Sequence, residues 1–248
     1  MSSYARRGVH GQTVETLARR VLSGEFPEGT TLDLVALQAE LDVSLTALRE
    51  SLKVLAAKGM VDARQKRGTF VRARSDWNLL DADVLRWQLA AHSAPDDDTT
   101  LLHQLDEVRA IVEPAAAGLA ARRRTDDDLA ALDAALAAMG EASAAASHAV
   151  ASDLAFHRAL LGATHNELLQ RMEMVIESGL AHRDRLVHGT GEADDPVPSH
   201  RAVLDAVRAG DAEGAASAMR ALLEKAVRDQ ARARDGEHGE RQARGAVD

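Results

Sequence analysis

The chain has 248 residues, 46% of them hydrophobic and only 2% aromatic, so its core must be built from Ala, Leu and Val. Such a composition favours close-packed helices, because Ala and Leu have high helix propensity. The absence of cysteine excludes disulfides and thiolate metal sites, and no apolar run reaches the ~18 residues that span a bilayer. The first residues lack the apolar stretch of a signal peptide, so we expect a cytoplasmic protein.

The net charge is −9, but positive and negative residues are unevenly distributed. Residues 1–75 hold 12 Lys or Arg and 8 Asp or Glu, a balance of +4. Residues 76–248 hold 18 and 31, a balance of −13. A basic segment joined to an acidic one is typical of a nucleic-acid-binding part attached to a domain of another kind. We therefore expect two domains with separate tasks.

The basic segment predicts three short helices followed by a β-hairpin, the layout of a winged helix-turn-helix domain. The predicted ranges are 12–23, 33–41 and 45–58 for the helices, and 60–64 and 69–72 for the strands. Asp33 and Ser44 precede the second and third helices as N-caps, and Gly59 ends the third. We place the DNA-binding domain at residues 10–74.

In a helix-turn-helix, side chains near the start of the second helix of the motif reach base edges. Ser44, Thr46 and Arg49 occupy these positions. Arg49 suits a bidentate contact with guanine, the commonest specific pairing. The alternative is that Arg49 pairs with Glu50 or Glu40 on a solvated helix face.

The hairpin tip contributes Lys66, Arg67 and Gly68 as candidates for contacts with phosphates or the minor groove. The segment 13–71 as a whole resembles the N-terminal domain of the GntR family of bacterial transcription factors. The matching residues are Leu37, Leu41, Val43, Ser44, Leu48, Arg49, Glu50, Leu55, Gly59, Met60, Val61 and 67–71.

This sequence departs from the family pattern near the second helix of the motif, here called the reading helix because it would contact DNA bases. Leu45 stands where the family usually has Arg, and Ala47 where Pro or Thr is common. Leu32-Asp33 replaces the family's Pro-Ser or Pro-Ala before the second helix. The loss of an arginine at Leu45 implies a different operator sequence but leaves the expected fold unchanged.

The acidic part predicts helices throughout, so the expected fold class is mainly α, with an all-α bundle after the winged helix-turn-helix. Residues 75–98 read as a linker with a short helix over 78–89, residues 99–232 as the bundle, and residues 233–248 as a disordered tail. The predicted bundle helices are 101–123, 126–139, 142–163, 167–186, 200–208 and 211–232, with a loop over 188–199. Pro114 predicts a kink or break in the first.

Polar residues in the bundle suggest a metal site. Asp153 and His157 are four residues apart, on the same helix face and about 6 Å apart at the backbone, so they can share one metal ion. His200 begins a later helix, and Arg109 precedes Glu113 by one turn. The alternatives are a surface Asp–His pair and an ordinary helix salt bridge.

Residues 100–232 resemble the FCD ligand-binding domain of the FadR subfamily of the same family. The matching stretches are 105–116, 153–157, 164–169 and 199–206. Many members bind a divalent metal ion through one Asp and three His. The resemblance therefore implies Asp153, His157 and His200 as ligands to zinc, nickel or manganese, with Leu222 in place of the third histidine.

The stretch 77–87 resembles the linker helix of the sugar-acid branch, the galactonate-type regulators. This resemblance implies a small carboxylate effector, such as a sugar acid or hydroxy acid, that chelates the metal ion and pairs with Arg109. Further candidates for the wall of the effector site are Asn166, Arg183, His165 and Arg185.

These observations together predict a homodimeric regulator, a repressor that the effector releases from double-stranded operator DNA. Two-fold operators require two reading heads, which is the reason for expecting a homodimer. No membrane partner is expected. One alternative is a metal-dependent hydrolase that uses Asp153, His157 and His200, and another is a helical interaction module. Because the sequence contains no H-E-x-x-H, G-x-S-x-G or phosphate-loop motif, we favour a regulator over an enzyme.

Overall fold

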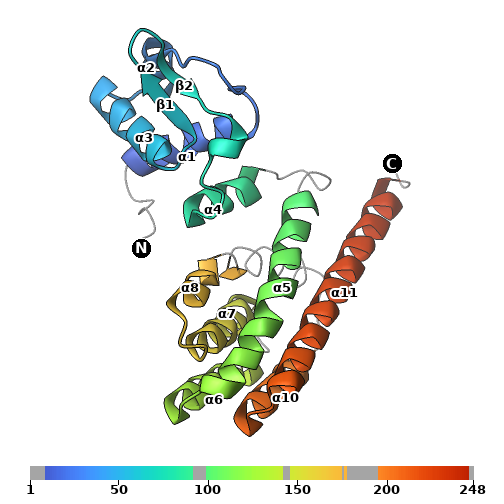
Figure 1. The fold of residues 1–248 in the computed structure, drawn as a ribbon. Coiled ribbons are helices and arrows are strands. Elements are labelled where there is room, and N and C mark those ends of the chain that lie inside the picture. The colour runs from blue at the N-terminus through green and yellow to red at the C-terminus, as the bar shows by residue number, and fades with distance from the viewer. Residues whose placement is uncertain (1–8, 92–98, 142–145, 175, 178–194, 246–248) are drawn as a thin grey trace. The chain divides into compact units, whose positions relative to one another are not determined.

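The chain forms two compact units, residues 1–99 and 100–248. The computed structural model describes residues 9–91, 99–141, 146–174, 176–177 and 195–245 (Figure 1). Within those ranges, no helix combines the length and the hydropathy that a membrane span requires.

The first unit is a winged helix-turn-helix, as predicted. Its elements are α1 (Val9–Leu22), α2 (Leu34–Leu41), α3 (Leu45–Ala57), β1 (Val61–Arg64), β2 (Gly68–Val71), a 3₁₀ turn (Arg74–Asp76) and α4 (Ala82–Ala91). The two strands pair antiparallel, with Val61 opposite Val71 and Arg64 opposite Gly68. This hairpin is the wing, and α2 and α3 are the two helices of the reading motif (Figure 1).

Local capping chemistry defines the ends of the reading motif. The Asp33 carboxylate accepts hydrogen bonds from the backbone N–H groups of Val35 and Ala36, and the Ser44 hydroxyl accepts one from Ala47 N at 3.1 Å. Gly59 follows α3 with φ +76°, a left-handed conformation that glycine adopts without strain. The predicted caps and stop are therefore confirmed.

The first unit includes α4, which lies in the segment predicted as a linker. Val84 and Trp87 of α4 are buried in the same apolar cluster as Leu17 of α1 and Leu48 and Leu55 of α3. The chain thus reaches residue 91 before it leaves the core of the DNA-reading unit. Spacing alone did not show this, because the partners of α4 lie about 30 to 70 residues earlier in the sequence.

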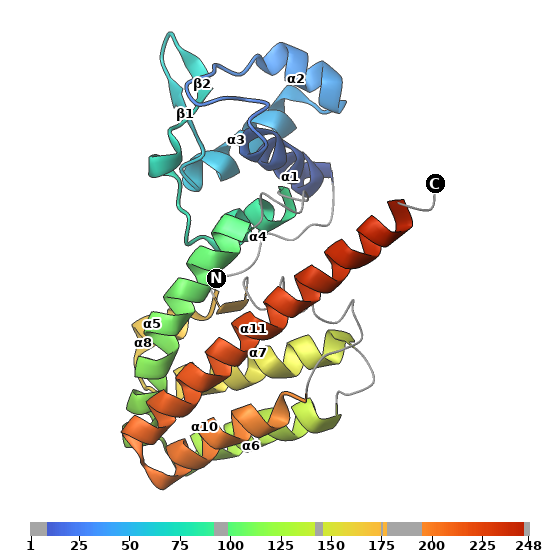
Figure 2. The same cartoon turned by 90° about the vertical axis from the view of Figure 1, so that its right-hand side faces the viewer.

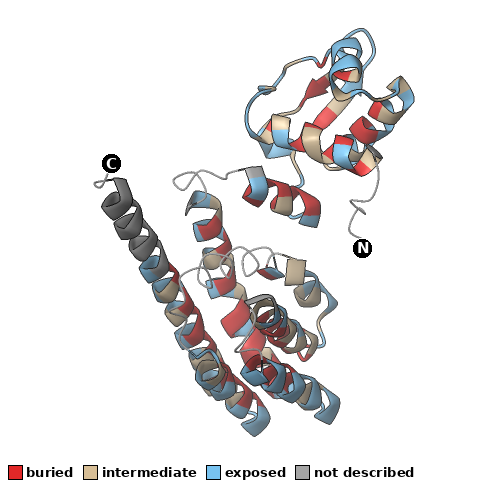
Figure 3. Cartoon of the chain, turned by 180° about the vertical axis from the view of Figure 1, so that it is seen from behind, coloured by how far each residue is buried: buried red, intermediate tan, exposed pale blue. Residues whose placement is uncertain are grey.

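The second unit is an all-α bundle. Its helices are α5 (Thr99–Arg123), α6 (Asp126–Glu141), α7 (Ala146–Gly162), α8 (Glu167–Arg171), α10 (Val197–Ala209) and α11 (Ala212–Gly245). Helix α6 packs against α7 and α10, and α10 packs against α11 (Figure 2). The buried residues gather on the facing sides of the helices (Figure 3), where alanines of α5 and α6 allow close approach to larger residues such as Phe156 and Met219.

Two helices in the first part of the bundle differ from the sequence predictions. Of the kink or break predicted at Pro114, the break is absent, because the proline removes only one backbone hydrogen bond from a helix whose inner face is buried. The long helix expected over 167–186 ends as α8 at Arg171, with a turn at Met172. Helical residues follow at 173–174 and 176–177, and 178–194 lie outside the described residues.

The last two helices also extend further than predicted. Helix α10 begins at Val197, with Pro198 in its first turn, where its missing N–H would have had no intrahelical partner. Helix α11 continues to Gly245, through most of the segment for which a disordered tail was expected. That segment is rich in Ala, Arg, Glu and Gln, which favour continuation of a helix already formed.

Gly59→Ala is expected to destabilise the first unit strongly. A Cβ at this position would overlap the backbone carbonyl of Asp76 and lie 3.3 Å from Trp77 Cα, in addition to the strain of φ +76°. We expect a loss of roughly 3 kcal/mol in the free energy of unfolding, measured by urea denaturation.

Gly24→Ala is the matched control, because Gly24 has φ +77° but no atom within 4 Å of the methyl group that alanine would add. It should cost only the backbone strain, about 1 kcal/mol. Equal losses for the two variants would show that the close approach at Asp76 has no energetic importance.

Candidate functional site

Two helices bring together the three predicted metal ligands. Asp153 and His157 lie one turn apart on α7, and His200 lies in the first turn of α10. All three side chains are buried, and one potential ligand atom from each lies within 4.8 Å of the others. His200 Nε2 is 2.9 Å from Asp153 Oδ1, and His157 Nε2 is 3.8 Å from the same oxygen. Their burial does not fit the alternative of a surface Asp–His pair.

The other nitrogen of each imidazole faces an acceptor. His157 Nδ1 lies 2.6 Å from Glu113 Oε2, and His200 Nδ1 lies 2.8 Å from the carbonyl oxygen of Pro196. A carbonyl oxygen can only accept, so Nδ1 of His200 donates to it and Nε2 is the nitrogen that faces Asp153. This is the arrangement in which outer partners orient metal-binding histidines.

The residues present fit a divalent metal ion. Both Nε2 atoms are buried and face Asp153 Oδ1, at 3.8 Å from His157 and 2.9 Å from His200, without a hydrogen bond of regular geometry in the parts of the chain that the structure describes. Such nitrogens are costly to bury unless something coordinates them. Two imidazole nitrogens and a carboxylate oxygen are suitable ligands for zinc, nickel or manganese. Leu222, at the position of the family's third histidine, is buried in the apolar core and offers no ligand atom.

Arg109 and Glu113 form a buried ion pair on α5, with Arg109 Nε 2.6 Å from Glu113 Oε1. Burial alone would raise the pKa of Glu113. The charges of Arg109 and His157 and their hydrogen bonds outweigh it and lower the pKa to about 2. Glu113 therefore stays ionised and can accept a hydrogen bond from His157 Nδ1. The pair is thus more than a helix salt bridge, because it continues into the metal ligands.

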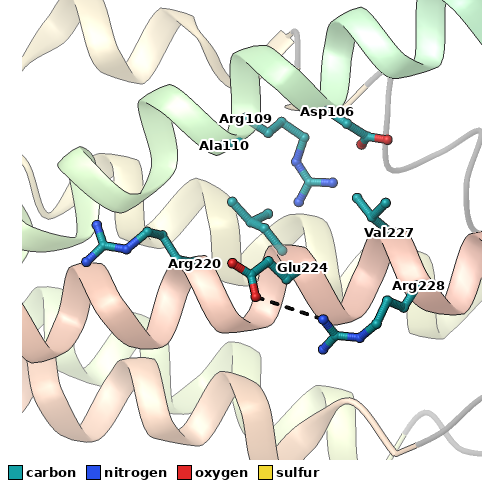
Figure 4. A pocket seen from close by; sticks show the side chains of 8 residues that line it. Asp106, Arg109, Ala110, Arg220, Glu224, Val227 and Arg228 are labelled. Atoms are coloured by element: carbon teal, nitrogen blue, oxygen red, sulfur yellow. Dashed lines mark ion pairs between the residues drawn. The ribbon is translucent and has the colours of Figure 1, made fainter.

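A cavity of about 370 Å³ lies between α5 and α11 (Figure 4). It is lined by Asp106, Arg109, Ala110, Arg220, Leu223, Glu224, Val227 and Arg228. The Arg109 side chain points from α5 towards α11, and its Nη2 has no hydrogen-bond partner among the described residues (Figure 4). The three metal ligands do not line this cavity. Arg109 is therefore the residue shared by the cavity and, through Glu113, the metal ligands.

The remaining effector candidates lie elsewhere. Asn166 caps α8, with its side-chain oxygen accepting from Leu168 N and Leu169 N. His165 is exposed, with Nε2 2.8 Å from Asp128 Oδ2. Neither lines the cavity between α5 and α11. Arg183 and Arg185 lie outside the described residues. The sequence analysis did not identify Asn166 as a helix cap, although its position before an apolar helix is typical of one.

The predicted DNA-contacting residues lie at the start of α3 and on the wing. The Ser44 hydroxyl oxygen caps α3, and its hydrogen can still be donated. Thr46 and Arg49 are exposed. The expected rival partners of Arg49 are engaged elsewhere in the chain. Glu50 pairs with Lys53 at 2.7 Å, and Glu40 with Arg20 at 2.9 Å.

The wing presents an exposed lysine beside an anchored arginine. Lys66 is exposed at the turn, with φ +67°, and Gly68 follows with φ +80°. The Arg67 guanidinium lies 3.6 Å from the ring centroid of Phe70, and its Nη2 donates to the carbonyl oxygen of Gly29 at 3.1 Å. Arg67 thus stiffens the wing as well as giving it charge.

Comparisons with known proteins agree with this arrangement. The family model "Bacterial regulatory proteins, gntR family" matches residues 10–71, and "FCD domain" matches residues 104–225. The galactonate operon transcriptional repressor of Escherichia coli K12 is 34% identical over 219 residues, which cover 87% of this chain and 93% of the relative.

Another relative is the putative L-lactate dehydrogenase operon regulatory protein of Escherichia coli K12. It is 34% identical over 195 residues, covering 75% of this chain and 72% of the relative. The solved structure of Lar, which controls the expression of the Listeria monocytogenes agr system, has a TM-score of 0.61 at 17% identity. It covers 93% of this chain and 99% of its own, and it supports the fold alone.

Zinc, nickel or manganese, each added singly, is expected to raise the thermal midpoint of the full chain. A ligand that binds only the folded state at 100 times its Kd stabilises it by about 2.7 kcal/mol. Asp153→Asn should abolish the rise, and Glu113→Gln should weaken metal affinity by about 10- to 100-fold, as expected of an outer partner.

His165→Gln is the control for these variants, because this exposed histidine lies away from the three ligands. It should respond to the metal ions as the unsubstituted protein does. A midpoint that rises equally in the Asp153→Asn variant and the unsubstituted protein would rule out this metal site.

Proposed function

The chain belongs to the GntR family of bacterial regulatory proteins and carries an FCD domain, and we propose that it is a repressor released from DNA by a small carboxylate effector. That it is a DNA-binding transcriptional regulator and not an enzyme follows from the family itself. The hydrolase alternative has no support from the family or from the relatives. We place its action in the cytoplasm, on double-stranded operator DNA.

The observation that carries the effector proposal is the buried position of Arg109. Its guanidinium lines a cavity with one nitrogen unpartnered among the described residues, while its Nε is held by Glu113. An arginine fixed in this way is suited to bind a carboxylate with little loss of conformational entropy. The two relatives named for galactonate and L-lactate operons point to hydroxy acids as the class of effector.

Asp153, His157 and His200 would hold a divalent metal ion in the same unit. The ion would supply Lewis-acid ligation for hydroxyl and carboxylate oxygens. Glu113 orients His157 on one side and holds Arg109 on the other. A change in the hydrogen bonds of Arg109 would therefore alter the orientation of His157. Effector and metal ion should then change each other's affinity by the same factor.

A homodimer completes the proposal. One helix-turn-helix reads one half-site, so a two-fold operator needs two chains.

Arg49→Ala should weaken binding to operator DNA by about 1–3 kcal/mol while leaving binding to unrelated DNA nearly unchanged, because the lost contact is with a base. Lys66→Ala is the comparison, since a phosphate contact is independent of sequence. It should weaken binding to both DNAs and lower the salt slope by about 1. Fluorescence anisotropy over a range of salt concentrations measures both, and equal losses on both DNAs for Arg49→Ala would contradict a base contact.

Galactonate or lactate, added with and without zinc or manganese, is expected to displace the protein from labelled operator DNA. Arg109→Lys should abolish the response, because an ammonium cannot bind Glu113 and the effector carboxylate at the same time in the way that the planar guanidinium can. Arg122→Lys, an exposed arginine on the same helix, should retain it. A screen in which no sugar acid or hydroxy acid alters DNA affinity under any metal condition would overturn the effector proposal.

A further inference from the structure

The C-terminal end of the reading helix is joined to the start of α4 by a partly buried charge cluster. Lys58 is the C-cap residue of α3, and its side chain is only 12% exposed. Its Nζ lies 2.6 Å from Asp81 Oδ1 and 2.9 Å from Asp83 Oδ2. The ammonium therefore has two carboxylate partners on a single neighbouring helix turn.

Both carboxylates are themselves fixed. Asp81 Oδ1 also accepts from the backbone N–H groups of Asp83 and Val84, at 2.9 and 3.2 Å, and so caps α4. Asp83 Oδ1 accepts from Arg86 Nη2 at 2.6 Å. Burial opposes ionisation of Asp83, but hydrogen bonds and charge from Lys58 and Arg86 prevail and lower its pKa. Asp83 therefore stays ionised, and the cluster pairs two basic side chains with two acidic ones.

Backbone contacts reinforce the same junction. The carbonyl oxygen of Lys58 accepts from Asn78 N at 2.9 Å, and Gly59 leaves no room for a side chain beside Asp76. Trp87, one turn beyond Asp83, is 2% exposed in the apolar core of the unit, and its ring centroid lies 5.5 Å from Lys58 Nζ. Helix α4 therefore packs on α1, within the apolar core that α3 shares, and is joined to the C-terminal end of α3 by charge.

We propose that Lys58 is a positioning residue for DNA recognition, which fixes α3, and with it Arg49, by bridging Asp81 and Asp83 without touching DNA itself. The proposal rests on the proposed reading of DNA by α3. An ammonium already held by two carboxylates in a neutral cluster offers little attraction to a phosphate. Its effect on DNA affinity would instead come from the orientation of the helix that it anchors.

Electrostatics and positioning predict opposite results for Asp83→Asn. Removing a negative charge from a DNA-binding unit should strengthen binding if charge alone matters. If Lys58 positions α3, loss of its ion pair with Asp83 should instead weaken DNA binding. The substitution is isosteric and leaves Asp81 to hold Lys58, so it is the mildest way to disturb the cluster.

The test uses the full chain and a fluorescein-labelled duplex of the DNA upstream of its own gene, titrated by anisotropy at several salt concentrations. We expect Lys58→Met and Asp83→Asn each to raise Kd by about tenfold, within the range of coupling between contacting residues. The slope of log Kd against log salt should stay unchanged, because no phosphate contact is lost. Lys58→Arg should retain most of the affinity.

Matched controls are Arg19→Met, an exposed basic residue on α1, and Glu28→Gln, an exposed carboxylate of the same unit. Neither should raise Kd appreciably. Circular dichroism at the titration temperature checks that each variant is folded. If Lys58→Met does not fold, the comparison of Asp83→Asn with Lys58→Arg still tests the proposal. A salt slope lowered by about 1 in Lys58→Met, or tighter binding by Asp83→Asn, would overturn the proposal. Failure of the unsubstituted protein to bind would instead contradict the proposed function.

Discussion

Glu113 has no access to water, yet it carries a full charge because Arg109 and His157 contact it from two sides. Removing Arg109 would leave an uncompensated carboxylate in the core of the bundle, which is among the most destabilising changes a fold can suffer. The positions of α5 and α7 are therefore constrained by electrostatics as well as by packing. That constraint also orients the imidazole of His157, so stability and the candidate metal site depend on the same carboxylate.

In the first unit, polar and charged side chains hold the two ends of the reading helix. Its reading helix begins with a hydroxyl cap at Ser44 and ends at a charge cluster around Lys58. Between these two anchors, exposed residues such as Thr46 and Arg49 are free to vary with the operator. A helix fixed at both ends can change its contacts with bases without changing its orientation.

The sequence predicted best where the chemistry is local. The caps at Asp33 and Ser44 and the stop at Gly59 each depend on a few neighbouring residues, and all three hold. The sequence did not predict contacts between residues that lie far apart in the chain. The contact between Glu113 and His157 joins residues 44 positions apart, and nothing in the spacing of either indicates the other. Pro114 shows the same limit in reverse, because the helix-breaking tendency of one residue yields to the burial of a whole helix face.

The packing of Trp87 has a practical consequence for any hybrid regulator assembled from this chain. The family model of the DNA-binding part ends at residue 71, which would be a natural place to join a foreign sensor domain. A junction there would discard Val84 and Trp87 and open a hole beneath α1 and α3. Truncation of a buried tryptophan typically costs about 3–5 kcal/mol, a large share of the roughly 5–15 kcal/mol that stabilises a domain. A transplantable reading head should therefore be cut after residue 91.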